Sequence, residues 1–270
     1  MSEASKEVTL GSSSKNLAKT FFIEIKKILT HFRKAGQTFM NSAYGRTELG
    51  ISKAKILDIG AGAGAFLQKM SEQGLECYGV DVNPNLADQA KKGGWLYHLG
   101  DLEEDTFSEQ FFDVITINHT LEHMHHPDRI LHLCHKYLKD DGQLVVGIPN
   151  ADSLIRTMFK ENWVYWEVPR HLYHFNPRNF KRLLNTHNFR VTAERFNSMP
   201  HQFTGSLQYL LDKRTKIPYS PKKMRTSAFD RFPAFARNPF LNLLFLPITL
   251  LFNRLALSDS FEVVSRKMLK

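Results

Sequence analysis

Three alternate glycines after a short apolar run constrain this chain more than any other feature. Residues 55–67 read KILDIGAGAGAFL. The apolar run before the glycines predicts a short buried strand, and residues 65–73 predict a helix. Gly60, Gly62 and Gly64 form the turn between them, where the missing Cβ lets the backbone approach a ligand. Because the first N–H groups of the helix face that turn, the segment predicts a nucleotide-binding corner.

Two aspartates near the glycines, Asp58 and Asp81, help to distinguish which nucleotide the corner binds. The spacing fits the dinucleotide pattern G-x-G-x-x-G/A, but Asp58 precedes the first glycine by two residues. A carboxylate there would repel a pyrophosphate, whereas it can sit beside the ammonium group of a ligand. Asp81, 21 residues after Gly60, can accept hydrogen bonds from both hydroxyls of a ribose. These residues indicate a nucleoside without choosing one.

Strand and helix patterns alternate five times with short connections, which predicts a parallel, doubly wound sheet. A ligand should lie at the carboxyl ends of its strands, where Gly60, Asp81, Asp101 and Asn118 converge. The predicted strands after the first are residues 75–81, 95–100, 112–118, 143–148 and 189–195, and the predicted helices are residues 65–73, 84–92, 128–139 and 176–187. The pair Asp141-Gly142 predicts a turn before the fifth strand.

With 270 residues, the chain is long enough for one α/β domain with extensions. We expect a disordered tail at 1–14, an amphipathic helix and its connection at 15–50, and the core at 51–196. A basic and hydrophobic insertion follows at 197–258, and residues 259–270 supply the final strand of the core sheet.

Five segments together resemble the class I methyltransferases that use S-adenosylmethionine (SAM). Two further segments are similar to sequences of a bacterial branch that includes ubiquinone-biosynthesis O-methyltransferases and methyltransferases of surface polysaccharides. They are LEH (121–123), within the histidine-rich stretch HTLEHMHHP, and PRHLYHF (169–175). The resemblance covers residues 55–196 and the last ten residues, but not 1–50 or 197–258. The five segments are LDIGAGAG (57–64), YGVD (78–81), GDLE (100–103), FDVITINHTLEH (112–123) and LKDDGQLVVGIPN (138–150).

The resemblance implies a seven-stranded Rossmann-like sheet, mostly parallel, with a late antiparallel strand at 261–267 and helices on both faces. It also implies roles in cofactor binding. Asp58, Gly60 and Gly62 would line the methionine end of SAM, Asp81 the ribose, and Asp101 with Leu102 the adenine. The predicted set is completed by Asn118 and His119 near the sulfonium and by Ala61, Gly64 and Val82.

Methyl transfer from a sulfonium is an in-line displacement, and a hydroxyl acceptor must also lose its proton. His123 and His119 are the first candidates for the base, followed by His171 and His174, with a structural role as the alternative for each histidine. The aromatic loop after the fifth strand predicts acceptor binding by Trp166, Arg170, His171 and Tyr173, or else a hydrophobic cover on the sheet edge.

The ubiquinone enzymes imply a divalent cation at E-x-x-E-H. In this chain His119 replaces the first carboxylate of that pattern, ahead of Glu122 and His123. Two imidazoles and one carboxylate make a poor magnesium site, although they can bind a transition metal. We therefore predict no metal.

The formal charge of +9 fits an anionic membrane or a phosphorylated substrate, and no nucleic-acid-binding module is recognised. Residues 213–237 contain eight Lys or Arg and one acid, and residues 240–257 are largely apolar. The segment predicts either an interfacial or re-entrant hairpin that contacts a membrane, or a helical pair packed over the active site. Its uninterrupted apolar stretch is far shorter than the roughly 20 residues of a spanning helix.

We therefore predict a SAM-dependent methyltransferase that acts on an oxygen of a small or lipid-linked acceptor and releases S-adenosylhomocysteine. One alternative is an NAD(P)-dependent oxidoreductase, which Asp58, Asp101 and the late antiparallel strand disfavour. The other is a non-catalytic, membrane-associated scaffold that binds SAM. Two widely spaced cysteines, Cys77 and Cys134, argue against a disulfide framework and a Cys-based zinc site. Together with the polar start of the chain, they predict a cytoplasmic protein. The segment 213–257 predicts that this protein is peripheral on the inner face of the membrane.

Overall fold

The computed structural model describes residues 54–84, 87–211 and 234–268. Residues Ser52–Lys270 form one unit by their internal contacts. The predictions for the tail 1–14, for the helix and connection 15–50, and for most of the basic segment 213–237 fall outside the described residues.

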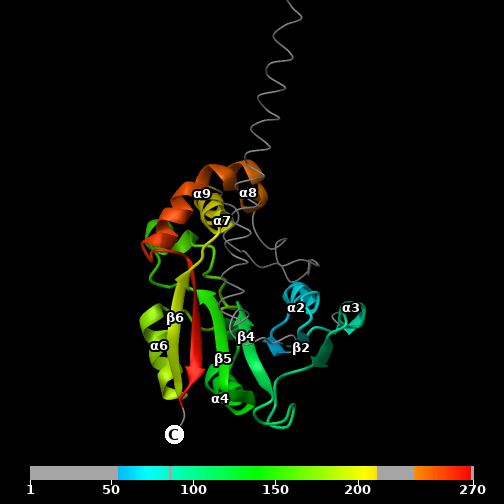
Figure 1. Ribbon diagram of the computed structural model, residues 1–270. Helices are drawn as coiled ribbons and strands as arrows, with labels where there is room; N and C mark the ends of the chain where they lie inside the picture. Colours follow the sequence, from blue (N-terminus) through cyan, green and yellow to red (C-terminus); the bar gives the residue numbers. More distant parts are fainter. Residues whose placement is uncertain (1–53, 85–86, 212–233, 269–270) are drawn as a thin grey trace, which may run out of the picture. The chain divides into compact units, whose positions relative to one another are not determined.

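A seven-stranded sheet in the order β3-β2-β1-β4-β5-β7-β6 forms the centre of the fold (Figure 1). The five strands from β3 to β5 run parallel, and β7 runs antiparallel to both of its neighbours. The predicted fold class, including the late antiparallel strand, is confirmed. The strands are β1 (Lys55–Ile59), β2 (Glu76–Asp81), β3 (Leu96–Leu99), β4 (Phe112–Asn118), β5 (Leu138–Pro149), β6 (Phe189–Phe196) and β7 (Ser260–Lys267).

The strand order reverses between β1 and β4. From β1 the chain moves outward through β2 to β3, and it returns to β4 on the other side of β1. In an open α/β sheet this reversal leaves a crevice at the carboxyl ends of the two central strands. The crevice lies beside the glycine turn, since Ile59 pairs with Ile117 just before both strands end.

The helices around the sheet follow the predicted alternation, with two differences. The predicted turn at Asp141-Gly142 is wrong, because both residues lie inside β5, which begins where α4 ends. Leu138 pairs with Phe112, and a shift of register before Val114 absorbs the extra residues. The aromatic loop, residues 150–176 after β5, also contains two short helices, at 154–159 and 160–162, that were not predicted from the sequence. The elements are α2 (Ala65–Ser71), α3 (Ala87–Gly93), η2 (Leu121–His123), α4 (Pro127–Tyr137), α5 (Leu154–Phe159), η3 (Lys160–Asn162) and α6 (Pro177–Thr186).

A group of helices between β6 and β7 lies beyond the ends of β4 and β5 (Figure 1). It consists of α7 (Pro200–Leu211), α8 (Ala234–Arg237) and α9 (Pro239–Arg254). Of the two alternatives for this segment, a hairpin within 240–257 is not formed, since α9 continues through Pro247 as one helix. Helices α7 and α9 instead form a helical pair. Phe203 of α7 and Phe252 of α9 share a buried cluster with Trp163 and Tyr165 of the aromatic loop, so the helices support that loop.

A buried carboxylate joins the loop to the sheet. Asp259, immediately before β7, is fully buried, and its Oδ1 accepts hydrogen bonds from Ser153 Oγ at 2.8 Å and Trp163 Nε1 at 2.6 Å. Burial raises the pKa of Asp259 to about 7, although the two donors lower it. Because an ionised carboxylate is costly to bury, the protonated form stabilises the native state.

Asp259→Asn should therefore change how stability depends on pH. The native pKa lies above the unfolded value, so the stability that Asp259 contributes is complete below about pH 4 and is lost as pH rises to about 7. Between pH 5 and pH 8 we expect the wild type to lose about 2–4 kcal/mol relative to the variant. Urea unfolding at both pH values measures this, with Asp152→Asn, at an exposed aspartate, as the control. Parallel pH profiles for wild type and Asp259→Asn would contradict the assignment.

Candidate functional site

The glycine turn follows β1 and has left-handed backbone at all three glycines, with φ of 75°, 54° and 68° at Gly60, Gly62 and Gly64. A Cβ on Gly60 would lie 2.2 Å from Thr120, and one on Gly64 would lie 2.4 Å from Trp95. Among the described residues, a Cβ on Gly62 would have only the Gly60 carbonyl oxygen within 4 Å, at 3.9 Å. Two of the glycines are thus required by packing, while Gly62 leaves an open backbone face for a ligand.

Asp81 at the end of β2 is tied to this turn. Its Oδ2 accepts a hydrogen bond from the Gly62 backbone N–H at 2.8 Å, and its Oδ1 accepts one from the Asn83 N–H at 2.9 Å. The Tyr97 hydroxyl donates to the Asp81 carbonyl oxygen at 2.9 Å. Because each carboxylate oxygen can accept more than one hydrogen bond, Asp81 is oriented and still able to bind two adjacent hydroxyls.

Asp58 lies in the floor of the corner, on β1. Its side chain is buried, and its Oδ1 accepts a hydrogen bond from Thr116 Oγ1 at 2.6 Å across the β1–β4 pair. Burial raises the pKa of Asp58 to about 7, the Thr116 hydroxyl lowers it, and the charge of Asp81 raises it further. A cationic group bound nearby would favour the ionised form.

The residues predicted to lie on the adenine side of the corner differ in how accessible their side chains are. Val82 is 67% exposed and Asp101 is exposed, so both are accessible at the ends of β2 and β3. Leu102 is 1% exposed and belongs to the main core with Tyr78 and Ile117. The Leu102 side chain thus packs into the core, and its assignment to the adenine stays a prediction. Val82 is the accessible apolar neighbour.

His119 stands at the end of β4, directly after Asn118. Its backbone is left-handed, with φ of 47°, and its N–H donates to the Gly147 carbonyl oxygen at 2.8 Å. The imidazole is 44% exposed, stacks on Tyr165 with ring centroids 5.7 Å apart, and places Nδ1 3.5 Å from Glu122 Oε1. His119 is thus an accessible base candidate with a carboxylate behind it.

Glu122 was quoted in a motif but not predicted as a site residue. Its side chain is 1% exposed, and neither carboxylate oxygen has a hydrogen-bond partner among the described residues. Burial raises its pKa, but the neighbouring His119 outweighs burial, so the net pKa is lowered. An ionised carboxylate buried without a hydrogen bond is costly, and its spacing three residues after His119 was the available signal.

The other candidate histidines are held by backbone carbonyls. His123 Nδ1 lies 3.0 Å from the Arg170 carbonyl oxygen, and His171 Nδ1 lies 2.8 Å from that of Tyr165. Burial lowers the pKa of His123, and it lowers that of His171 to about 4. His174 Nε2 lies 3.3 Å from the Trp166 carbonyl oxygen. The structure therefore groups these rings but leaves His119 the most accessible candidate near the glycine turn.

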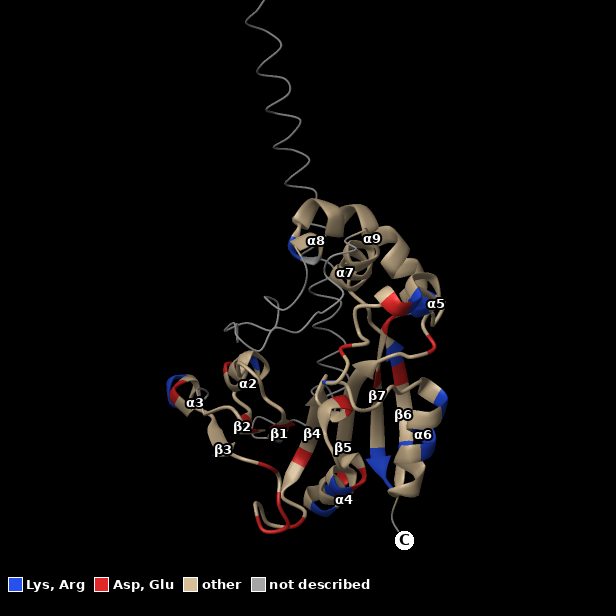
Figure 2. Ribbon diagram, turned by 180° about the vertical axis from the view of Figure 1, so that it is seen from behind, with Lys and Arg blue, Asp and Glu red and all other residues tan. Residues whose placement is uncertain are grey.

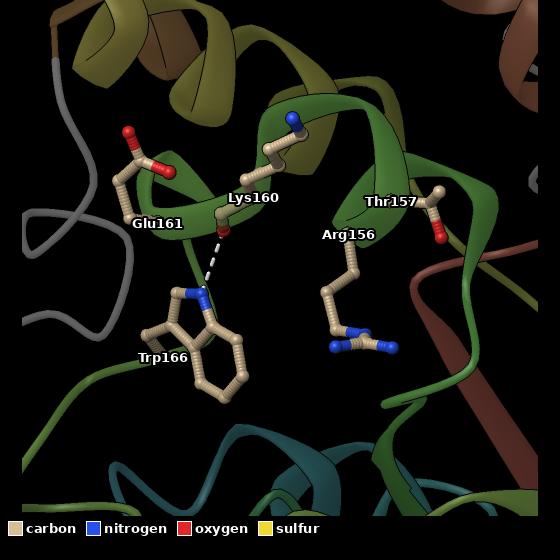
Figure 3. Close-up of a pocket in the computed structure, with 5 residues that line it drawn as sticks. All are labelled: Arg156, Thr157, Lys160, Glu161 and Trp166. Carbon is tan, nitrogen blue, oxygen red and sulfur yellow. Dashed lines mark hydrogen bonds between the residues drawn. The ribbon is translucent and has the colours of Figure 1, made fainter.

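The predicted acceptor residues have different partners in the structure, except that Arg170 and His171 both face Glu167. Arg170 pairs with Glu167 at 2.7 Å, and Tyr173 donates to the His125 carbonyl oxygen at 3.2 Å. Trp166 lines a cavity of about 640 Å³ with Arg156, Thr157, Lys160 and Glu161. Figure 3 shows the Arg156 guanidinium and the Trp166 indole on one side of the ribbon, with the Lys160 ammonium and the Glu161 carboxylate directed away from them. The charged groups do not converge, so the cavity is not by itself a formed anion site.

Glu122, His123 and His171 can each offer one ligand atom within 4.8 Å of the other two, so this group could hold a metal ion. This set replaces His119 of the expected pattern with His171. Two imidazoles and one carboxylate suit a transition metal and not magnesium, which prefers oxygen ligands. No chemical step is therefore assigned to a magnesium ion here.

Comparison with known proteins identifies related chains. The family described as "Methyltransferase domain" matches residues 31–194. An uncharacterized protein of Methanocaldococcus jannaschii is 30% identical over 111 residues, which cover 41% of this chain and 52% of that protein. A ubiquinone biosynthesis O-methyltransferase of Coxiella burnetii is 28% identical over 123 residues, which cover 43% of this chain and 53% of that enzyme. The chain thus spans about half the length of these curated relatives.

Solved structures share the fold. The crystal structure of a SAM dependent methyltransferase from Archaeoglobus fulgidus aligns with a TM-score of 0.54 and 20% identity, covering 92% of this chain and 99% of that one. At this identity the likeness concerns the fold alone. The family match, in contrast, includes the glycine turn, Asp81 and the His119–His123 segment.

The glycine turn gives a matched pair of substitutions. Gly60→Ala should lower the free energy of unfolding by about 2–5 kcal/mol, because a left-handed backbone and overpacking against Thr120 add together. Gly62→Ala carries the backbone cost alone, about 1–2 kcal/mol. Urea unfolding followed by circular dichroism compares them. Equal losses would show that Thr120 moves aside and that packing does not fix Gly60.

Proposed function

The chain belongs to the methyltransferase domain family, and from this membership we propose that it transfers the methyl group of SAM to an oxygen of a small or lipid-linked acceptor. The observation that carries the proposal is the hydrogen bond from Gly62 N–H to Asp81, which joins an open glycine turn to an oriented carboxylate. Such a corner suits a nucleoside that carries an amino-acid tail, since it offers hydroxyl acceptors and an approachable backbone.

SAM would supply, when bound, a methyl group activated by the sulfonium: the acceptor would bond to the methyl carbon as the S–CH3 bond breaks in line, and S-adenosylhomocysteine would leave. The residues of this chain bind and orient the reactants. Asp81 accepts the hydrogen bonds of the ribose hydroxyls, Gly62 presents its open backbone to the methionine end, and Asp58 lies below the turn as a carboxylate near the ammonium group. Val82 and Asp101 flank the adenine side. Binding in one geometry removes much of the entropic barrier to displacement.

His119 is the residue we assign as general base. The hydroxyl of an acceptor must lose its proton as the new C–O bond forms, and a positioned histidine can take it. His119 is favoured over His123 and His171 because its ring is partly exposed and follows β4 beside the glycine turn, whereas His171 is buried with its Nδ1 bound to a carbonyl. The proton would go to His119 Nε2.

Glu122 acts through His119 as a positioning residue. Its carboxylate faces His119 Nδ1 at 3.5 Å. A carboxylate on that side favours the tautomer with the proton on Nδ1, which leaves Nε2 as the acceptor, and it stabilises the imidazolium after proton transfer. Stacking on Tyr165 restricts rotation of the ring. This pairing accounts for a buried carboxylate that has no hydrogen bond within the described part of the chain.

The choice of oxygen and of a lipid-linked acceptor rests on two supports. A related protein is named as a ubiquinone biosynthesis O-methyltransferase, and a histidine base is needed for a hydroxyl but not for an unprotonated amine or a thiolate. A lipid-linked acceptor also requires that the enzyme reach a membrane, for which residues 213–257 are the candidate segment at an anionic surface. We propose that the protein works in the cytoplasm, with this contact on the inner face of the membrane.

The first test is calorimetric titration of the wild type, Asp81→Ala and Asp88→Ala with SAM, S-adenosylhomocysteine and NADH. We expect SAM and S-adenosylhomocysteine to bind, and Asp81→Ala to weaken both by about 10- to 100-fold, because hydrogen bonds to a charged group contribute about 1.5–3 kcal/mol. Asp88→Ala, at an exposed acid on α3, should bind like wild type. Binding of NADH without SAM, or SAM affinity that is unchanged in Asp81→Ala, would overturn the proposal.

The second test concerns the base and uses an acceptor found by screening hydroxylated aromatic compounds and lipid extracts for S-adenosylhomocysteine release. His119→Ala should lower kcat by about 10²- to 10⁴-fold at unchanged SAM affinity. Glu122→Gln should cause a smaller loss and shift the acidic limb of the kcat–pH profile, which a purely structural role would not move. His132→Ala, at an exposed histidine on α4, serves as a control and should keep the wild-type kcat. If His123→Ala abolished turnover while His119→Ala kept it, His123 would be the base instead.

A further inference from the structure

Helix α9 has an exposed apolar stripe. Phe240 and Leu244 are each 68% exposed, Leu251 is 51% exposed, and Pro247 is exposed between them. At 3.6 residues per turn these four positions fall within about 60° of one another around the helix. Leu255, which follows the last turn, is also 55% exposed. A soluble protein seldom presents so many large apolar side chains on one line unless something binds there.

The opposite face of α9 already has its partners. Phe252 and Thr249 are buried, and Phe245 and Ile248 pack on the cluster that includes Phe203 of α7. Asn238 caps the start of the helix by accepting hydrogen bonds from the N–H groups of Phe240 and Leu241. Internal packing therefore fixes α9 with one apolar face inward, so the exposed stripe is a stable surface feature of the folded helix.

The charged residues of the described helices α7, α8 and α9 have a single sign. From Asn197 to Leu257 the sequence contains nine Lys or Arg and two acids, Asp212 and Asp230. No acid occurs in α7, α8 or α9, and Figure 2 accordingly shows no red on these helices. Arg237 and Arg254 lie at the two ends of α9. Apolar side chains between basic residues match the layering of an anionic bilayer surface, with acyl chains below and phosphates above.

We propose that the stripe Phe240, Leu244, Pro247 and Leu251 inserts into the boundary between headgroups and acyl chains of an anionic membrane, with α9 lying along the surface. Within the described residues, no helix is long and apolar enough to cross a membrane, and a helix of 16 residues is suited to lie in the interface. A second copy of this chain would cover the apolar residues equally well, but it would bring its own positive charge against the first.

The contact would orient the catalytic half of the molecule. Helices α7–α9 lie beyond the ends of β4 and β5 (Figure 1), which is the edge that carries His119. Helix α7 also packs against α5 and η3 of the aromatic loop. A surface-bound α9 would thus hold the acceptor side of the site toward the lipid. This consequence rests on the proposed function, whereas the membrane contact itself requires no turnover.

Co-sedimentation of the full chain with vesicles tests the contact. The vesicles are made of phosphatidylcholine with or without phosphatidylglycerol. The test variant carries both Leu244→Glu and Leu251→Glu. The matched control is Leu96→Glu, at a leucine on β3 that is 59% exposed. We expect the wild type to prefer the anionic vesicles, the double variant to partition about tenfold more weakly or worse, and the control to be unchanged. Binding should also weaken as salt screens the basic residues.

The same samples separate the competing explanations. Circular dichroism and SAM calorimetry show whether the double variant is folded, and sedimentation velocity reports its oligomeric state. The proposal is overturned if the wild type binds neither vesicle at low salt or if the double variant binds like wild type. Two further outcomes overturn it when vesicle binding is kept. If the double substitution converts a dimer to a monomer, the stripe binds a second copy of the chain. If it lowers the free energy of unfolding, the stripe is covered by residues 15–50. Vesicle binding without SAM binding would overturn the catalytic proposal and leave the membrane contact standing.

Discussion

The hydrogen bond from Gly62 N–H to the Asp81 carboxylate is the interaction on which the site depends. It joins the turn after β1 to the end of β2, and the carbonyl oxygen of Val80 strengthens the junction by accepting the N–H groups of Gly60 and Ala61. The left-handed backbone of the glycines lets those N–H groups point at β2. A carboxylate that helps to fold the turn is also fixed for recognition, because its lone pairs are oriented before a ligand arrives. In the proposed function, this one contact would serve both the stability of the turn and the recognition of the ribose.

Buried carboxylates recur around this corner, and each has a different compensation. Asp58 has the Thr116 hydroxyl, Asp259 has Ser153 and Trp163, and Glu122 has an imidazole at longer range. For the two aspartates, burial raises the pKa to about 7, so protonation can relieve the cost of burial. Glu122 differs, since its pKa is lowered beside His119. Because its pKa is lowered, folding favours the ionised form of Glu122, and the charge is compensated by the neighbouring His119 and not by protonation.

The sequence predicted the parts of the structure that local patterns determine. The sheet class was predicted from the apolar runs of the strands. The cofactor corner was predicted from the three glycines and Asp81, because the carboxyl ends of parallel strands lie at the same edge of a sheet. The burial of the Leu102 side chain was not predicted, since its contact with the core depends on strands distant in sequence. The partners of Arg170 and Tyr173 were not foreseeable, because Glu167 and the carbonyl of His125 compete for them only in the folded loop. Likewise Pro247 suggested a break, but packing on α7 keeps α9 whole.

The insertion between β6 and β7 can vary without disturbing the sheet. Its two ends meet where the Asn197 N–H donates to the Ser260 carbonyl oxygen and the Ser260 N–H donates to Ser198 Oγ. Because the ends are already closed by the β6–β7 pair, lengthening the segment between them adds little loop-closure entropy. The cofactor corner has no such freedom, since Gly60 and Gly64 are fixed by Thr120 and Trp95. The sheet thus fixes the geometry of the glycine corner, whereas the apolar and basic segment 197–258, which we propose for the acceptor side, is attached to it through this closed pair of ends.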